Sequence, residues 1–178
     1  FKETSYGDII IMTSLFHPNL MQANQIINKG RKYNIYMELG SRELSYLSLK
    51  RKNLYKTFHG LVSGLKALHD FGFIHCDIKL SNIVIVENEG NDEQTCKIID
   101  FGLALPKTKY LGKIDGIFPR YTITYRPPEI YDHVMSEKSD IWALGACFYE
   151  LLFSESLIPI MENDKQYKRY VRSLEKNI

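Results

Sequence analysis

The chain has 178 residues, of which 44% are hydrophobic and 25% are charged, and 23 Lys and Arg against 21 Asp and Glu give a formal net charge of +2. This balance is typical of a folded globular domain and excludes disorder and collagen-like repetition. The small net charge does not indicate nucleic acid or an anionic membrane as an obligatory partner, and no apolar run approaches the roughly 20 residues of a membrane span.

In the first half, apolar positions predict a helix, two strands and a second helix. The dense apolar residues of 5–16 predict a short buried helix. The stretches 20–27 and 33–39 are separated by a turn-forming cluster and predict an antiparallel pair of strands. From 54 to 71 the apolar residues follow helical spacing, which predicts a long helix with one buried face and Gly72 as its stop.

In the second half, short apolar runs at 83–86 and 96–99 predict a β-hairpin with a polar tip. The stretch 101–128 has no sustained period, and irregular segments of this length are usually functional. Two helices are predicted after it, an apolar one from 139 or 140 to 153 and a basic amphipathic one at 164–174. Because strands come early and helices late, the order predicts an α+β fold with two unequal halves.

Four motifs carry chemical information. H-C-D-I-K-L-S-N at 75–82 follows the long helix, D-F-G at 100–102 follows the hairpin, P-P-E at 127–129 closes the irregular stretch, and D-I-W-A-L-G at 140–145 opens the apolar helix. In this order they resemble the catalytic loop, magnesium motif, A-P-E motif and D-x-W-x-x-G helix of eukaryotic protein kinases. Tyr125 to Glu129 looks most similar to the cyclin-dependent and MAP kinase branch.

The residue types in these motifs suit phosphoryl transfer. Asp77 is the candidate base that orients an acceptor hydroxyl and receives its proton. Asn82 and Asp100 offer oxygen ligands to Mg²⁺. Lys79 can place its ammonium group on the transferring phosphate, and in the family a Lys here marks Ser/Thr specificity.

The resemblance implies a bilobal protein-kinase fold with a partial small lobe at 1–39, a hinge at 40–43 and a mainly helical large lobe at 44–178. It also assigns an ATP site: Met37 as gatekeeper, Glu38, Leu39 and Gly40 as backbone partners of adenine, Glu43 near the ribose and Val84 as the adenine floor. By the same resemblance, Asp140 anchors the catalytic loop, Thr122 lies near the acceptor residue, and His75 and Phe101 join an apolar spine.

Several positions depart from the family pattern. Cys76 replaces the Arg that normally pairs with a phosphorylated activation loop, which predicts activity independent of that phosphorylation. No glycine-rich loop or lysine-bearing strand precedes the first helix, where Asp8 takes the place of the usual Glu, and Glu129 has no visible Arg partner. The chain is therefore expected to be an internal portion of a larger kinase, truncated at both ends.

The predicted function is ATP- and Mg²⁺-dependent phosphorylation of Ser or Thr on a protein substrate, with a regulatory protein subunit as a possible partner and neither nucleic acid nor membrane. A pseudokinase scaffold is the alternative, and a small-molecule phosphotransferase is a third reading. Three cysteines without C-x-x-C spacing predict reduced thiols in an intracellular protein, cytoplasmic or nuclear. Frequent Lys, Ile, Asn and Tyr fit an AT-rich genome such as that of a large DNA virus.

Overall fold

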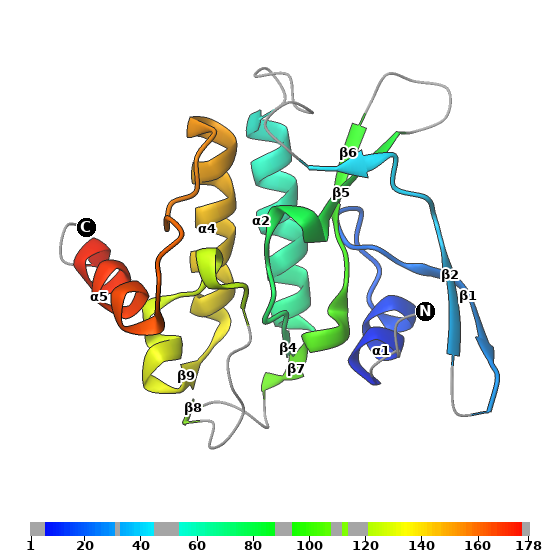
Figure 1. The fold of residues 1–178 in the computed structure, drawn as a ribbon. Helices are drawn as coiled ribbons and strands as arrows, with labels where there is room; N and C mark the ends of the chain where they lie inside the picture. The colour runs from blue at the N-terminus through cyan, green and yellow to red at the C-terminus, as the bar shows by residue number, and fades with distance from the viewer. Residues whose placement is uncertain are drawn as a thin grey trace.

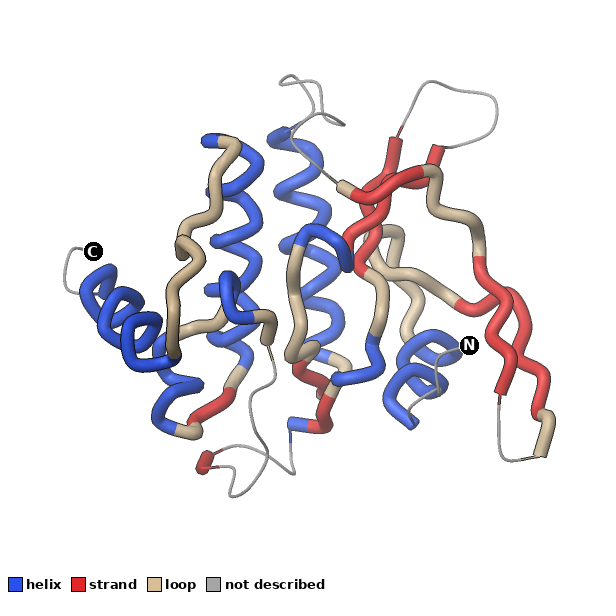
Figure 2. The backbone as a smooth tube through the Cα atoms, viewed as in Figure 1, coloured by secondary structure: helices blue, strands red, loops and turns tan. Residues whose placement is uncertain are grey.

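The structure is a computed structural model that describes residues 6–30, 33–44, 54–87, 94–107, 112–113 and 121–175. Figure 1 shows α1 (Tyr6–Ser14) and the pair of β1 (Ala23–Asn28) and β2 (Tyr33–Met37) at one end of the molecule and α5 (Asp164–Glu175) at the other. Between them, α2 (Leu54–Asp70) and α4 (Glu137–Phe153) lie side by side. The tube in Figure 2 shows the longer strands together with one helix on one side, and the other long helices on the other side with short strands among them. The mixture confirms the α+β prediction.

The strand-rich end begins with α1 (Tyr6–Ser14), followed by β1 (Ala23–Asn28) and β2 (Tyr33–Met37). These two strands pair antiparallel, so the predicted helix and strand pair are confirmed. α1 and β2 are shorter than predicted, and β1 covers 23–28 instead of 20–27. α1 packs against the 3-10 turn at Phe101–Leu103, which contains the D-F-G motif. The helix therefore lies directly on a predicted site segment.

A three-stranded antiparallel sheet lies in the middle, in the order β3 (Arg42–Glu43), β5 (Ile83–Glu87) and β6 (Gln94–Ile98). The predicted hairpin is confirmed, and its tip lies outside the described residues. β3 was not predicted, because two exposed residues give no alternating pattern. The far edge of β6 is held by Ile98, whose N–H donates to the Asn19 carbonyl and whose carbonyl accepts from Met21, both at 2.9 Å.

Three helices form the other side: α2 (Leu54–Asp70), α4 (Glu137–Phe153) and α5 (Asp164–Glu175). All three helices are confirmed, although α4 begins at Glu137, two or three residues before the predicted start at 139 or 140. Ser136 caps it by accepting from the Lys138 N–H at 3.2 Å, while Ser139 Oγ accepts from the Ser136 N–H at 3.1 Å. This reciprocal capping fixes the start of α4.

Four short strands complete the described fold. β4 (Phe73–Ile74) pairs with β7 (Leu105–Pro106), and β8 (Gly112–Lys113) pairs with β9 (Val134–Met135). The predicted irregular stretch 101–128 thus contains β7, β8 and two 3-10 turns, and part of it lies outside the described residues.

One large core joins α1, the three-stranded sheet, α2 and α4, and a smaller cluster of Ile158, Tyr167 and Val171 seats α5. Phe101, Ile11, Leu65 and Ile85 are among the fully buried side chains of the large core. None of the described helices has the length and apolar character to cross a membrane. Cys76, Ile78 and Leu80 belong to the large core, which therefore holds the loop at 75–82 in place.

Candidate active site

The loop at 75–82 is anchored from below by the fully buried carboxylate of Asp140, at the start of α4. The backbone N–H groups of His75 and Cys76 donate to it at 2.7 and 3.0 Å. Cys76 has a φ of 67°, in the left-handed region that most residues avoid. Two charge-assisted hydrogen bonds thus hold the strained turn that leads into Asp77.

Asp140 has two further donors that the sequence analysis missed. His69 Nε2 donates to Asp140 at 2.8 Å, and the Tyr121 hydroxyl donates at 2.9 Å. Burial raises the pKa of Tyr121 well above its ordinary value, so its hydroxyl keeps the proton that it donates. These partners come from the end of α2 and from the segment before Thr122. No local pattern in the sequence could link residues so far apart.

The structure brings Asp77, Lys79 and Asn82 together. Lys79 Nζ lies 2.9 Å from Asp77 Oδ2, and the Asn82 side-chain amide donates to the same oxygen at 3.1 Å. The same amide also donates to the Asp77 carbonyl at 2.8 Å, which closes the loop. Asp77 and Asn82 are both buried, so the carboxylate is held in one orientation.

Thr122 completes this cluster. Its hydroxyl donates to Asp77 Oδ1 at 3.0 Å and accepts from Lys79 Nζ at 3.2 Å. Its backbone N–H donates to the same carboxylate oxygen at 3.2 Å. The arrangement holds a hydroxyl between a carboxylate and an ammonium group, which is the geometry that general-base activation of a hydroxyl needs.

Asp100 follows β6 with a left-handed φ of 63°, and its carboxylate accepts from the Gly102 N–H at 3.3 Å. The neighbouring Ile99 N–H donates to the Asn82 carbonyl at 2.9 Å, so the two predicted Mg²⁺ ligands lie on adjoining segments. Their oxygen atoms suit that ion. No cluster of three His, Cys, Asp or Glu that could hold a metal occurs in the described part of the chain.

His75 is structural, as predicted. Its ring is fully buried and meets Phe101 edge-on, with centroids 5.4 Å apart. Nε2 donates to the Ile99 carbonyl at 3.1 Å, and Nδ1 accepts from the Asp77 N–H at 3.3 Å. Burial lowers the pKa of His75, in agreement with a neutral ring that donates from one nitrogen and accepts at the other. The ring thereby joins the two motifs.

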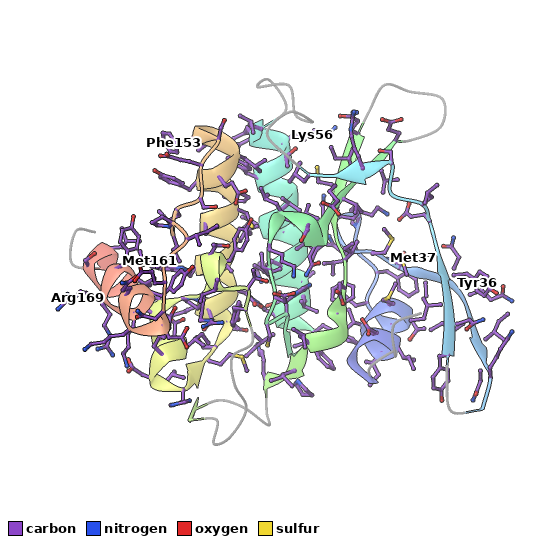
Figure 3. The ribbon with its side chains drawn as sticks, viewed as in Figure 1. Tyr36, Met37, Lys56, Phe153, Met161 and Arg169 are labelled. Carbon is purple, nitrogen blue, oxygen red and sulfur yellow. The ribbon has the colours of Figure 1, made fainter. Side chains whose placement is uncertain are left out.

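The predicted ATP-site residues lie between β2 and β5. Gly40 lies so close to Val84 that an added Cβ would be 2.9 Å from the Val84 Cβ, and Glu43 pairs with Val84 across β3 and β5. Met37 lies at the end of β2 with 44% of its surface exposed, so the described residues do not enclose it (Figure 3). Glu38 forms an ion pair with Lys97 of β6, which the sequence analysis did not anticipate.

Charged residues in two places have partners that the sequence analysis did not predict. Glu129 has a partner, because Ser139 Oγ donates to it at 2.7 Å. The basic face of α5 is not wholly solvated: Lys168 and Arg172 lie 3.2 and 2.6 Å from Asp132. Lys168 and Arg172 are 36 and 40 positions from Asp132, and Ser139 is 10 positions from Glu129.

Two residues that depart from the motif pattern, Cys76 and Asp8, are both buried. Cys76 is fully buried, and its thiol contacts Met135 Sδ at 3.3 Å, which agrees with a small apolar filler. Asp8 is buried in α1, with 7% of its surface exposed.

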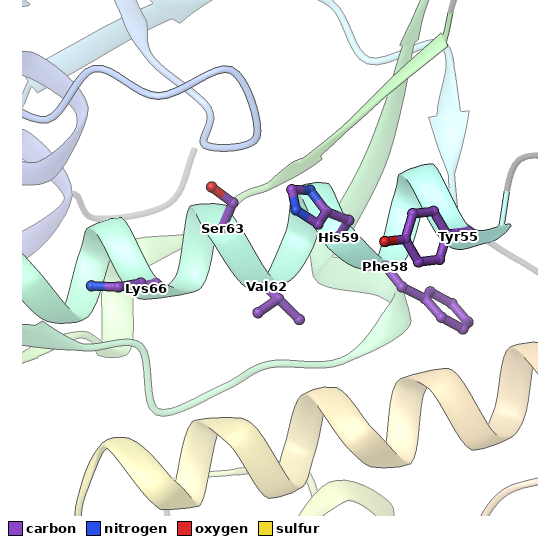
Figure 4. A pocket seen from close by; sticks show the side chains of 6 residues that line it. All are labelled: Tyr55, Phe58, His59, Val62, Ser63 and Lys66. Atoms are coloured by element: carbon purple, nitrogen blue, oxygen red, sulfur yellow. The ribbon is translucent and has the colours of Figure 1, made fainter.

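A hollow of about 420 Å³ lies along α2 and is open to solvent (Figure 4). The side chains around it are Tyr55, Phe58, His59, Val62, Ser63 and Lys66. None of them is a predicted site residue, so this hollow is separate from the Asp77 cluster.

Comparison with known proteins shows which proteins this chain is similar to. A family model described as the protein kinase domain matches residues 2–178. GLH-binding kinase 1 and the stress-activated protein kinase jnk-1, both of Caenorhabditis elegans, are each 31% identical to the chain, covering 93% and 97% of it. The CTD kinase subunit alpha of Saccharomyces cerevisiae is 34% identical over 85% of the chain. The aligned regions span 44%, 31% and 29% of these three relatives, so the chain corresponds to less than half of each.

A solved structure of the yeast RNA Pol II CTD kinase CTDK-1 complex shares the fold. The TM-score is 0.76 at 27% identity, over 96% of this chain and 56% of that one. The predicted kinase fold, and its likeness to the cyclin-dependent and MAP kinase branch, are thereby confirmed.

Proposed function

Since the chain belongs to the protein kinase family, we propose that the protein transfers the γ-phosphate of ATP to a Ser or Thr hydroxyl of a protein substrate. The observation that supports this most directly is the Asp77, Lys79 and Thr122 cluster. A hydroxyl there donates to a carboxylate at 3.0 Å and accepts from an ammonium group at 3.2 Å. A substrate hydroxyl needs the same pair of contacts to attack a phosphate.

Each residue has a proposed part in the reaction. Asp77 orients the incoming hydroxyl and takes its proton, and Lys79 neutralises charge on the transferring phosphate. Asn82 keeps the Asp77 carboxylate in place through its amide, at 3.1 Å. Asn82 and Asp100 would hold Mg²⁺, which neutralises the charge of the ATP phosphates when bound. Met37, Glu38, Gly40, Glu43 and Val84 remain the proposed nucleotide-binding residues.

A pseudokinase scaffold is the second candidate, and Cys76 favours it because no Arg is available at that position to bind an activating phosphate. A regulatory protein subunit is a proposed partner in either case, since the solved structural relative is a complex.

The test is transfer of labelled phosphate from ATP and Mg²⁺ to a basic acceptor protein, followed by phosphoamino-acid analysis. The whole protein should label Ser or Thr, and Asp77→Asn should lose this activity. Asp70→Asn, which breaks an exposed ion pair with Lys66 on α2, serves as the matched control and should remain active. Absence of transfer by a folded whole protein would favour the scaffold.

A further inference from the structure

The segment after β2 crosses one face of the β5–β6 hairpin. Val84 and Lys97 are directly opposite each other in this antiparallel pair, so their side chains lie on the same face of the sheet. Glu43 of β3 is opposite Val84 on its other side. A single row of three residues therefore runs across the sheet beneath the segment 38–41.

Two members of this row contact the crossing segment. Val84 meets Gly40 so closely that a Cβ on Gly40 would lie 2.9 Å from the Val84 Cβ. Lys97 Nζ donates to the Glu38 carboxylate. The segment is then joined to the sheet by Ser41, whose N–H and hydroxyl both donate to the Ile85 carbonyl, at 2.8 and 2.9 Å. Its course is thus fixed by three successive contacts.

The ion pair is sheltered from solvent. The Lys97 side chain is 15% exposed and the Glu38 side chain 33%, against 71% and 64% for the Lys66–Asp70 pair on α2. Solvent and salt screen a sheltered pair less than an exposed one. The Lys97–Glu38 contact can therefore hold the backbone more firmly than a surface ion pair can.

We infer that Lys97 is a positioning residue for nucleotide binding: it fixes Glu38, and with it the backbone of 38–40 that would face adenine. This inference rests on the proposed kinase function. Lys97 also stands three residues before Asp100, on the strand that Asn19 and Met21 hold at its other edge. One strand thus sets the positions of both the segment 38–40 and the proposed Mg²⁺ carboxylate.

The experiment measures the dissociation constant of Mg²⁺–ADP by calorimetry and the KM and kcat for ATP with the whole protein. Lys97→Met should weaken nucleotide binding and raise KM about tenfold, with kcat changed less than about twofold, because the residue touches neither phosphate nor acceptor. Lys97→Arg should restore most of the affinity, and Glu38→Gln should repeat the loss. Lys66→Met should leave affinity unchanged.

The outcomes separate this inference from the proposed function. If the unmodified protein binds no Mg²⁺–ADP, the kinase proposal and this inference both fail. If it binds, but folded Lys97→Met and Glu38→Gln bind equally well, Lys97 has no positioning role while the kinase proposal stands. Should Lys97→Met not fold, Glu38→Gln alone decides the question. If Lys97→Met loses affinity for Mg²⁺–ADP and Lys97→Arg does not recover it, the ion-pair argument is also overturned.

Discussion

Replacing Asp140 by Ala should destabilise the protein by about 4 kcal/mol. The buried carboxylate accepts from the N–H groups of His75 and Cys76, from His69 and from Tyr121. The two backbone donors belong to a packed loop and would lose their partner, at about 1–3 kcal/mol for each unsatisfied group. Loss of the hydrogen bonds from His69 and Tyr121 destabilises the protein further. Removal of the buried charge partly offsets this, because the desolvation penalty of the carboxylate disappears.

The assay is urea unfolding of the whole protein, followed by circular dichroism. Tyr121→Phe removes one of the four bonds and leaves the backbone donors paired, so it should cost about 1 kcal/mol. Comparison of the two variants isolates the role of the carboxylate. A loss below about 1 kcal/mol for Asp140→Ala would refute the view that this side chain holds the loop.

Three other predictions concern catalysis, regulation and pH. Asp77→Asn should lower kcat by at least about a hundredfold with Mg²⁺–ADP binding nearly intact, whereas Asp100→Asn should weaken that binding as well; a calorimetric titration that finds the reverse pattern contradicts the assignment. Phosphatase treatment should leave the transfer rate unchanged because Cys76 cannot bind an activating phosphate, and a large loss would disprove this. Because burial lowers the pKa of His75 from 6.5, the unfolded chain takes up a proton below pH 6.5 before the folded one does. The free energy of unfolding should then fall from pH 6.5 to 5 by up to about 1.4 kcal/mol per pH unit, and more gently in His75→Asn; parallel curves for the two proteins would exclude His75 as the cause.

Much of the fold could be predicted because its elements carry local signals. α2 was recognised by helical spacing, since Leu61, Leu65 and Leu68 all bury one face. The hairpin of β5 and β6 was recognised from two apolar runs around a polar tip. The predicted start of α4 falls too late because apolar residues alone do not show the Ser136 cap, which adds Glu137 and Lys138 to the helix.

The grouping of Asp77, Lys79 and Asn82 was predictable because six consecutive residues of one loop contain all three. The partners that other elements supply could not be predicted. Tyr121 contacts Asp140, Ser139 contacts Glu129 and Lys97 contacts Glu38 because the fold packs these elements together. The spacing of residues in the sequence does not predict such contacts. The hydrogen bonds and the ion pair that hold the site residues in place are therefore known only from the structure.

The anchoring of the loop at 75–82 also has a consequence for hydrogen exchange. The amides of His75 and Cys76 lie in an irregular loop, where amide protons usually exchange quickly. Both donate to a carboxylate 65 and 64 residues further along the chain, at the buried start of α4. Their protons become accessible when α4 separates from the loop. These two amides should consequently exchange as slowly as those of the core helices, and bound nucleotide should slow them further.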